Sequence, residues 1–376
     1  MVLNTAVVGA GVVSGIHLSG LDKNPRTKLV AVCDLDEERA HSAAADYGIR
    51  AYTDLETMLA EEDLDWLHIC TSVQSHLPLA RMAIEAGVPV QIEKPITETS
   101  EEFEELEALS KRHGVLVSSV HQHVFDPAMR RAMRRIESGE LGKIRGVDVL
   151  YAGEPGPSEK LRGSWAGELP GGEFEEGIPH PIYLTLRAGG YPRSRDDIAV
   201  TTGLVDNHVG FDYDTALVQY TSENGVPCTI TMRSDAAPQQ LIHIHGDRGS
   251  MTVDLISQTV QNVGLNYNGS PIAKVRNNVR RATDRLVGTV KNVVLVGRRK
   301  MNDDWETDRT VDSHYYQFDA EAKAIAVGGE SPVPLDQAKW TIEIMEAIRE
   351  EATGDRPKTS AGELSHVDSL SRADGE

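Results

Sequence analysis

A short apolar stretch near the N-terminus runs directly into a glycine-rich turn and then into a helical pattern. Residues 5–17 read TAVVGAGVVSGIH. The β-branched residues favour a strand, Gly9 permits a tight turn, and Gly11 lets a ligand approach the backbone. The N-terminus of the next helix directs free N–H groups at an anion. This strand–turn–helix predicts a dinucleotide-binding unit whose pyrophosphate is lined by Gly9, Gly11, Val12, Val13 and Ser14. Ser14 stands where the fingerprint has a third Gly or Ala.

A second predicted strand, residues 28–33, ends in Asp34. An acidic residue about twenty positions after the glycines accepts hydrogen bonds from the ribose hydroxyls. Asp34 is followed by Leu35 and Asp36, with no Arg or Lys beside it. Because a 2′-phosphate would meet two carboxylates there, we expect NAD rather than NADP. The alternative is an ordinary βαβ unit with a glycine turn.

Length and composition limit the class of protein. The chain has 376 residues, enough for two domains of ordinary size. It lacks both an apolar run long enough to span a membrane and the basic start of a signal peptide, so we expect no transmembrane segment. Its three cysteines are widely spaced, which argues against a disulfide framework or a zinc site. We therefore expect a cytoplasmic protein without a bound metal.

The formal net charge is −20. An acidic surface repels nucleic acid, so we expect no nucleic-acid partner. This balance is typical of a salt-adapted cytoplasmic protein, and equally of an ordinary acidic enzyme. Full folding and activity in low-salt buffer, with no gain from molar KCl, would exclude salt adaptation.

The order of predicted elements indicates an α/β chain of two domains and a tail. Residues 1–122 alternate strands with helices, which predicts a doubly wound parallel sheet, the Rossmann arrangement for NAD. Residues 123–355 carry strands with little helix between them, which predicts an α+β domain with an open, mainly antiparallel sheet. We expect residues 356–376 to be a disordered tail and the loop 153–172 to shape a pocket. The strands of the second domain are expected at 144–151, 198–205, 215–220, 228–234, 241–245 and 250–255.

The segment 274–300 carries nine basic residues and one acid, Asp284. Val275, Val279, Leu286, Val290 and Val294 are spaced to lie on one face of a helix. One interpretation is a surface for an anionic partner, which could be a membrane face or an acidic patch of a sister subunit. The other is a helix packed on the sheet with solvated charges. Deletion that leaves oligomeric state and localisation unchanged would exclude the first.

Glu93-Lys94-Pro95 follows the strand predicted at residues 88–92. Ligands of doubly wound sheets bind beyond the carboxyl ends of the strands. An ammonium group there can hydrogen-bond a substrate hydroxyl and stabilise the alkoxide that develops as hydride leaves. Lys94 is therefore a candidate catalytic residue.

A third group of residues, 171–180, reads GGEFEEGIPH. Glu176 and His180 are four apart, so in a helix they share a face. A carboxylate that orients an imidazole raises its basicity, which suits a general base near neutral pH. Pro179 must lie in the first turn of a helix. The alternative is a helix N-terminus whose acids complement the dipole, which leaves His180 without a role.

Four segments together resemble the Gfo/Idh/MocA family of oxidoreductases, from residue 5 to about 350. They are the glycine loop with His17, residues 71–76 (TSVQSH), Glu93-Lys94-Pro95, and residues 171–180. The resemblance implies a Rossmann domain that binds NAD(P) and a second domain that binds substrate and often forms the subunit interface. Lys94 corresponds to the catalytic lysine of the family, His180 to its base, and Glu176 to an aspartate of its motif.

The resemblance also implies the remaining site residues and a homodimer or homotetramer. Cofactor contacts are expected from Asp34, Thr71, His76 and Glu93 besides the glycine loop, and substrate contacts from Lys94, Gln122, Glu176 and His180. The chain departs from the family at Thr71-Ser72-Val73, where Thr-Pro-Asn is usual, and at Glu176. These departures bear on substrate identity more than on the type of reaction.

The expected function is NAD(P)-dependent hydride transfer between nicotinamide and a secondary alcohol of a sugar, polyol or nucleotide-sugar. His180 would remove the hydroxyl proton while Lys94 polarises the same oxygen. One alternative is redox-neutral cleavage of a glycoside with tightly held NAD. The other is a non-catalytic NAD-sensing protein.

Overall fold

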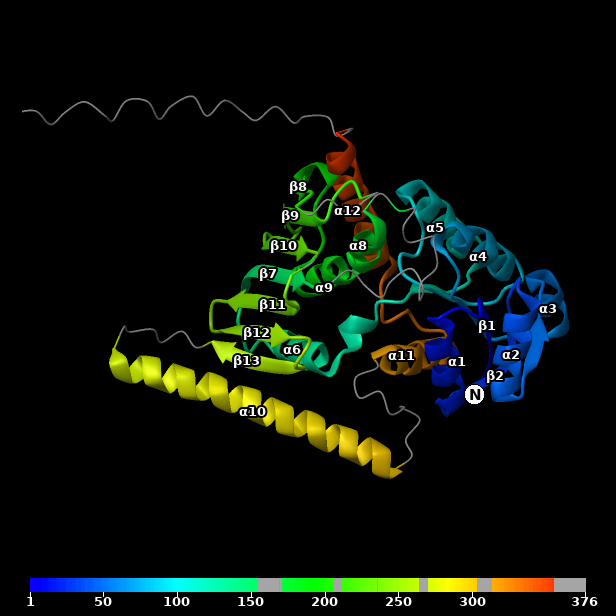
Figure 1. The fold of residues 1–376 in the computed structure, drawn as a ribbon, viewed down its shortest axis with the longest axis horizontal. Coiled ribbons are helices and arrows are strands. Elements are labelled where there is room, and N and C mark those ends of the chain that lie inside the picture. The colour runs from blue at the N-terminus through cyan, green and yellow to red at the C-terminus, as the bar shows by residue number, and fades with distance from the viewer. Residues whose placement is uncertain are drawn as a thin grey trace, which may run out of the picture.

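The computed structural model describes residues 1–153, 169, 171–205, 211–234, 236–263, 270–302 and 313–354, without the side chains of 173, 296 and 299–302. The expected tail at 356–376 and most of the loop 153–172 lie outside these residues. The described chain forms two sheets with helices packed on them (Figure 1).

The first sheet has six parallel strands. Their spatial order is β3(Arg50–Tyr52), β2(Thr27–Cys33), β1(Leu3–Val8), β4(Trp66–Ile69), β5(Val90–Ile92) and β6(Val117–Ser119). The order reverses direction between β1 and β4, which is the switch point where doubly wound sheets bind ligands. The expected Rossmann sheet is confirmed, and β3 is an additional short strand at its edge.

Local sequence explains where the helices of this sheet begin and end. They are α1(Ser14–Lys23), α2(Glu37–Tyr47), α3(Leu55–Glu61), α4(His76–Glu85) and α5(Ser100–His113). The side chain of Asp36 caps α2, Asp54 caps α3 and Thr99 caps α5, each by accepting backbone N–H bonds. No side chain caps α1, so a ligand can reach its N-terminal N–H groups.

The second sheet has seven strands and is antiparallel except where β7 pairs with β10. The spatial order is β13(Thr259–Val263), β12(Ser250–Asp254), β11(Gln239–Gly246), β7(Ile144–Ala152), β10(Pro227–Arg233), β9(Thr215–Thr221) and β8(Ala199–Gly203). The expectation of a mainly antiparallel sheet is confirmed.

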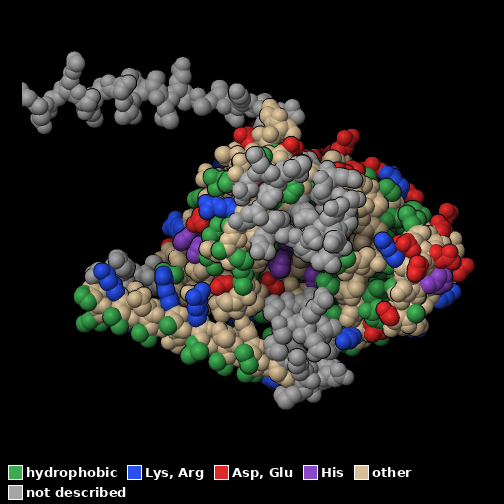
Figure 2. All heavy atoms as spheres, in the orientation of Figure 1, with side chains coloured by type: hydrophobic (Ala, Val, Ile, Leu, Met, Phe, Trp, Pro, Cys, Tyr) green, Lys and Arg blue, Asp and Glu red, His purple; other side chains and the backbone are tan. Residues whose placement is uncertain are grey.

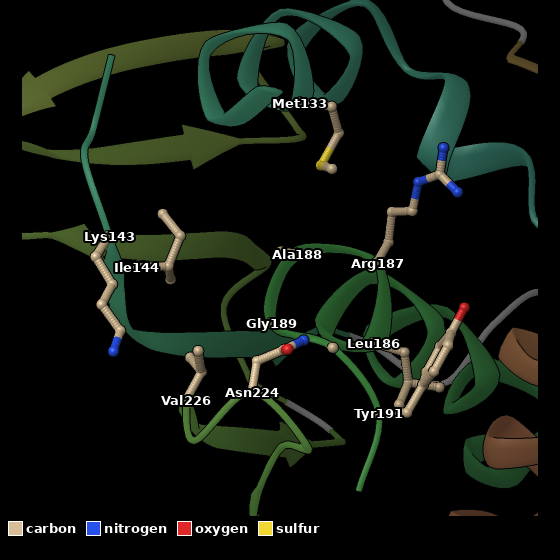
Figure 3. A pocket seen from close by; sticks show the side chains of 11 residues that line it. Met133, Lys143, Ile144, Leu186, Arg187, Ala188, Gly189, Tyr191, Asn224 and Val226 are labelled. Atoms are coloured by element: carbon tan, nitrogen blue, oxygen red, sulfur yellow. The ribbon is translucent and has the colours of Figure 1, made fainter. Parts of the chain in front are cut away.

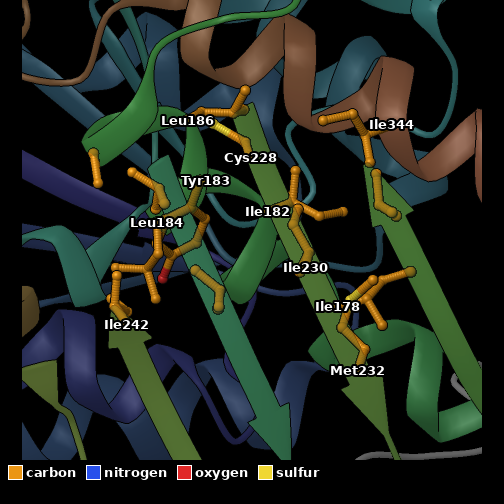
Figure 4. Close-up of a cluster of buried hydrophobic side chains, with 14 of the residues drawn as sticks. Ile178, Ile182, Tyr183, Leu184, Leu186, Cys228, Ile230, Met232, Ile242 and Ile344 are labelled. Carbon is orange, nitrogen blue, oxygen red and sulfur yellow. The ribbon is translucent and has the colours of Figure 1, made fainter. Parts of the chain in front are cut away.

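One face of the second sheet is covered by helices and forms the larger core. The helices are α6(Pro127–Glu137), α9(Pro179–Gly189) and α12(Leu335–Thr353), with the short α8(Gly172–Gly177) before α9. Figure 4 shows Ile182 of α9 beside Ile230 of β10, and Ile344 of α12 belongs to the same cluster. This packing fixes α8 and α9, and with them residues 171–180, against a rigid sheet.

The end of the described chain returns to the first sheet. Phe318 and Ala322 of α11(Ser313–Val327) share a core cluster with Leu18 and Leu21 of α1. Residues of α12 likewise join the cluster under α4 and α5. Helix α10(Pro271–Asn302) lies along β13 (Figure 1). In the described residues, no helix is both long and apolar enough to cross a bilayer.

All three cysteines, Cys33, Cys70 and Cys228, are buried and free. Burial also raises the pKa of the Cys33 and Cys228 thiols to about 11. The expectation that they form no disulfide is confirmed.

Candidate active site

The predicted site residues follow the carboxyl ends of neighbouring parallel strands. Gly9 follows β1, Asp34 follows β2, Thr71 comes two residues after β4, and Glu93 and Lys94 follow β5. Gln122 begins a short 3₁₀ turn, η2(Gln122–Phe125), after β6. Because these five strands are parallel and adjacent, all six residues lie at one edge of the sheet.

The glycine loop has the shape that a pyrophosphate needs. Gly9 has a φ of +94°, and a Cβ there would lie 2.6 Å from the carbonyl oxygen of Cys70, so no other residue fits. A Cβ at Gly11 would meet nothing within 4 Å, which leaves open space over the backbone. Val12 is 70% exposed beside it. The open loop and the uncapped N-terminus of α1 fit a dinucleotide phosphate.

Ser14 and Asp34 hold this loop in place. The Ser14 hydroxyl donates to the carbonyl oxygen of Gly11 at 2.5 Å. The Asp34 carboxylate accepts the N–H of Ala10 at 2.6 Å and that of Asp36 at 2.9 Å. Asp34 therefore ties the glycine loop to the end of β2, a contact that the sequence analysis did not anticipate.

His76 is a buried link between two loops. Its Nε2 lies 3.1 Å from the carbonyl oxygen of Thr71 and its Nδ1 lies 3.0 Å from that of Pro95. The Lys94–Pro95 peptide bond is cis. Burial lowers the pKa of His76, although both carbonyl groups and Glu93 oppose the shift. With both nitrogens occupied by main chain, His76 can act on a cofactor only through Thr71 and Pro95.

Glu93 lies inside a buried cluster of histidines. Its Oε1 is 2.9 Å from His17 Nε2, and its Oε2 accepts the N–H of Lys94 at 3.1 Å. His17 Nδ1 is in turn 2.7 Å from His68 Nδ1. Burial disfavours the charged carboxylate, but His17, followed by His314 and Lys94, outweighs burial and lowers the pKa of Glu93 to about 2. Glu93 is thus ionised and committed to orienting the residues around it.

His17, Glu93 and His314 bring three metal-ligand atoms within 4.8 Å of one another. We expected no metal from the sequence. His17 and Glu93 already bond to each other, and Glu93 also holds the backbone of Lys94. These contacts satisfy the polar atoms of Glu93 without an ion, so we assign the cluster a supporting role.

Lys94 and Glu176 form a partly buried ion pair. The Lys94 ammonium contacts the Glu176 carboxylate and donates to the Glu176 carbonyl oxygen at 3.0 Å. Only 9% of the Lys94 side chain and 16% of the Glu176 side chain are exposed. The pair joins the end of β5 to the end of α8, and so joins the two sheets.

His180 is the second residue of α9, directly after Pro179 in the first helical position. Its Nδ1 lies 3.0 Å from the hydroxyl of Tyr183, one turn along α9. That hydroxyl accepts the N–H of His123 at 3.2 Å and donates to Gln122 Oε1 at 3.3 Å. Since the Tyr183 hydroxyl donates its hydrogen to Gln122, it must accept one from His180. His180 then carries its proton on Nδ1, which leaves Nε2 unprotonated.

The charge state of His180 follows from its surroundings. Removal from water lowers the pKa of His180 well below the usual value, and the charge of Lys94 lowers it further. Burial likewise lowers the pKa of His121 to about 3, and its ring stacks on Tyr183 at 4.3 Å. His180 is therefore neutral at physiological pH and able to accept a proton.

A buried charged pair supports the loop that leads to Glu176. Glu175 is fully buried, accepts the N–H of Gly171 at 2.9 Å and binds the guanidinium of Arg349 on α12 at 2.6 Å. Arg349 also donates to the carbonyl oxygen of Glu98, before α5. Glu175 is thus a buried anchor and not an exposed residue at a helix N-terminus.

The structure brings together Lys94, Glu176, His180 and Gln122, all predicted from the sequence. It adds Tyr183, His68 and Arg349, which the sequence analysis missed. A histidine inside the apolar run Trp66–Ile69 was a visible signal for His68. Tyr183 and Arg349 carried no signal, because an aromatic in a buried helix and an arginine in an amphipathic helix are ordinary.

A separate hollow of about 450 Å³ lies at the far end of α9 (Figure 3). Met133, Lys143, Arg187, Tyr191 and Asn224 are among the residues that line it. None of the predicted site residues lines this hollow. The hollow is therefore separate from the candidate active site.

Comparison with known proteins assigns the family. A family model described as "Oxidoreductase family, NAD-binding Rossmann fold" matches residues 3–121, and the GFO/IDH/MocA C-terminal domain matches residues 129–252. Together they span more than half of the chain. Inositol 2-dehydrogenase of Rhizobium meliloti is 25% identical over 263 residues, which cover 68% of this chain and 76% of the relative.

Two solved structures share the fold. One is an oxidoreductase from Agrobacterium radiobacter in complex with NAD+, L-tartaric acid and magnesium, with a TM-score of 0.77, 18% identity, and coverage of 95% of this chain and 98% of that one. The other is the WlbA dehydrogenase from Bordetella pertussis in complex with NADH and UDP-GlcNAcA, with a TM-score of 0.73, 18% identity and coverage of 94% and 96%. The chain belongs to the GFO/IDH/MocA family of NAD-binding oxidoreductases.

Proposed function

We propose that this protein is an NAD-dependent dehydrogenase that interconverts a secondary alcohol and the corresponding ketone on a sugar, polyol or nucleotide-sugar. His180 is the general base and Lys94 the group that stabilises charge on the reacting oxygen. The observation that carries the proposal is the position of His180 on α9, with its Nδ1 3.0 Å from the Tyr183 hydroxyl and close enough to Lys94 of the Lys94–Glu176 pair for that charge to lower its pKa.

His180 accepts the hydroxyl proton at Nε2. Its Nδ1 is occupied by Tyr183, so the second nitrogen is the one available to substrate. A base of this kind contributes about 10²–10⁴-fold to a proton transfer. The low pKa keeps the imidazole unprotonated, so it is in the form that can accept a proton.

Lys94 supplies positive charge where negative charge develops on the substrate oxygen. Its ammonium has three donors, and Glu176 occupies part of that capacity through its carboxylate and its carbonyl group. A remaining donor can bind the substrate oxygen in a site shielded from water. Gln122, whose Oε1 accepts a hydrogen bond from the Tyr183 hydroxyl, has its NH₂ group available for a neighbouring substrate hydroxyl.

The residues that would hold the dinucleotide are Gly9, Gly11, Val12, Val13, Ser14 and Asp34, with Thr71 and Glu93 toward the nicotinamide end. NAD, when bound, supplies the hydride acceptor. We propose NAD over NADP because Asp34 and Asp36 place two carboxylates at the end of β2, where a 2′-phosphate would be repelled.

The substrate class is supported by the relatives and by the residues at the site. Relatives named above include a dehydrogenase of inositol and one crystallised with UDP-GlcNAcA. Gln122, Glu176 and His180 offer donors and acceptors suited to a substrate with several hydroxyl groups. We also propose that the protein is cytoplasmic and forms a homodimer or homotetramer. Light scattering of the purified protein would measure the mass of the assembly.

The test is NADH formation over a panel of sugars, polyols and nucleotide-sugars, in low salt and in molar KCl. We expect a rise in NADH absorbance with at least one class. A panel without activity, from protein whose NAD binding is intact, would contradict the proposal. NAD that stays bound through gel filtration without net NADH would indicate the redox-neutral alternative.

A further inference from the structure

Helix α10 is a long helix on the outside of the second sheet. It runs for 32 residues, from Pro271 to Asn302, beside the edge strand β13 (Figure 1). The amino-acid pattern alone does not decide whether the apolar face of α10 packs on the sheet. The contacts of α10 answer this question, because they identify which face meets the protein.

The face of α10 that meets the protein is polar. Asp284 accepts the backbone N–H of Asn262 at 2.9 Å, and Asn292 donates to the carbonyl oxygens of Ser257 and Gln258 at 3.1 and 3.0 Å. A Cβ at Gly288 would lie 2.9 Å from Thr259. Since 284, 288 and 292 are four residues apart, they form one stripe along the helix.

The opposite face of α10 is apolar and exposed. Val275, Val279, Leu286, Val290, Val293 and Val294 are between 51% and 66% exposed, and Ile272 is 82% exposed. Their spacings of three, four and seven residues place them on one face, turned away from the face that contains 284, 288 and 292. Figure 2 shows hydrophobic side chains along the outer edge of this helix. We call these seven residues the apolar stripe.

Positive charges border the apolar stripe mainly on one side. Arg276, and next to it Arg280 and Arg298, lie along that border. Lys274, Arg281, Arg285 and Lys291 lie farther round, toward the face that meets the protein, where Arg285 contacts Asp254 at 3.3 Å. All seven are exposed, and Asp284, the acid of α10, is already bonded to Asn262. This concentration of positive charge belongs to a chain whose net charge is −20.

We propose that α10 lies flat on an anionic lipid surface. An apolar stripe flanked by Lys and Arg is the arrangement by which interfacial helices insert apolar side chains among the acyl chains while cations reach lipid phosphates. The rest of the acidic protein would then face away from the bilayer. A cytoplasmic protein can bind in this way to the inner, anionic leaflet.

Charge favours this occupant over a second copy of the chain. Burying two apolar stripes against each other would bring Arg276, Arg280 and Arg298 near the cations of the second helix, and like charges at an interface are unfavourable. An anionic bilayer satisfies the stripe and the charges at the same time. The inference is independent of the proposed reaction, because it uses no residue of the site.

The experiment is sedimentation of the full chain with vesicles of phosphatidylcholine alone or mixed with phosphatidylglycerol. We expect the bound fraction to rise severalfold with phosphatidylglycerol and to fall as KCl is added. The variant V279D/L286D should lose binding, and R276Q/R280Q should bind more weakly. V327D, which changes an 81% exposed valine at the end of α11, is the matched control and should bind as the wild type does.

Each variant is also measured for NAD binding and for mass by light scattering. The proposal would be overturned if the protein sediments equally with both kinds of vesicle, or if it sediments with neither kind. If V279D/L286D has a lower mass than the wild-type oligomer while the wild type does not bind vesicles, the stripe is covered by a second copy, which also overturns the proposal. Retained NAD binding in V279D/L286D excludes misfolding as the cause of lost vesicle binding.

Discussion

Tyr183 is the residue on which the chemistry of His180 depends most. Its hydroxyl accepts from His123 and donates to Gln122, so it can only accept from His180. This fixes which imidazole nitrogen is free. The sequence predicted His180 and Gln122 but not the hydroxyl between them, because Tyr183 lies in a helix whose residues are almost all buried and gives no pattern of its own.

Tyr183→Phe tests this positioning role. Without the hydroxyl, both tautomers of His180 become accessible and the base is partly misdirected, so we expect kcat to fall by about tenfold to a hundredfold, less than the whole contribution of a base. The pH–rate profile should also shift, because His180 gains freedom to take a proton at either nitrogen. The measurement is kcat against pH on the substrate that the panel identifies.

The control is Tyr220→Phe. Tyr220 is also buried and its hydroxyl donates to the carbonyl oxygen of Gly190 at 3.0 Å, away from Lys94 and His180. This change should lower stability and leave the pH profile as it is. If Tyr183→Phe does the same, Tyr183 has a structural role only.

Buried neutral histidines predict a loss of stability in acid. The pKa of His121 is lowered to about 3 by burial, whereas in the unfolded chain it has the usual value of 6.5. Below about pH 6.5 the unfolded chain binds a proton that the folded chain does not, so stability falls as pH decreases toward 3. The slope is about 1.4 kcal/mol per pH unit for each such group.

His121→Gln removes this group, so the slope of the unfolding free energy against pH should fall between about pH 6 and pH 5. The expected decrease is at most that of one bound proton, about 1.4 kcal/mol per pH unit. Urea unfolding at several pH values measures the slope. His41→Gln, at a histidine that is 67% exposed, is the control and should leave the slope unchanged. A slope that is the same in both variants would contradict the assignment of His121 as neutral in the fold.

At the scale of elements, periodicity and turn residues predicted most of the fold. The helices at 37–47, 76–86 and 335–352 lie where their apolar spacing and end residues placed them. The strand β3 was missed because three residues are too few for an alternating pattern. For α10 the apolar spacing predicted an apolar face but not which way that face points, since only contacts such as those of Asp284 and Asn292 show which face meets β13.

The buried pair of Glu175 and Arg349 connects α8 to α12 and predicts a large effect on stability. Arg349→Met leaves the fully buried Glu175 without its cation, which typically costs about 3–5 kcal/mol. Arg26→Met breaks the surface pair with Asp319, where Arg26 is 46% exposed, and should cost less than about 1 kcal/mol. Denaturant midpoints compare them. Equal effects would show that the buried pair is not an anchor.

Glu176 illustrates what spacing alone leaves open. The four-residue separation predicted that Glu176 orients His180, and that role stays a prediction. The structure divides the segment into α8 and α9, with Glu176 in the first and His180 in the second. The contacts described for the Glu176 side chain are with Lys94, which is distant in sequence, so no local pattern could have indicated them.

For the whole molecule, the net charge of −20 predicts a dependence of stability on salt. Repulsion among like charges destabilises the compact state, and salt screens it as the Debye length falls from about 30 Å at 0.01 M to about 10 Å at 0.1 M. We expect Tm to rise over this range in KCl. A further rise of Tm into molar KCl would indicate salt adaptation. A Tm that stays flat or falls from 0.01 M KCl upward would contradict both the repulsion among like charges and salt adaptation.

The chain also returns on itself, which the sequence did not reveal. Helices α11 and α12 pack on the first sheet although they follow the second in sequence. His314 and Phe318 of α11 thereby lie beside His17, close to Glu93. Helix α11 thus helps to hold the residues before Lys94, and long-range packing of this kind leaves no local signal.

The most direct test of the whole account is the turnover of Lys94→Ala beside its affinity for NAD. If Lys94 stabilises the reacting oxygen, NADH formation should fall by about 10²-fold or more while the Kd for NAD stays near the wild-type value. Lys143→Ala, in the distant hollow at the end of α9, should change neither. Wild-type turnover in Lys94→Ala would contradict the assignment of this site as the place of reaction.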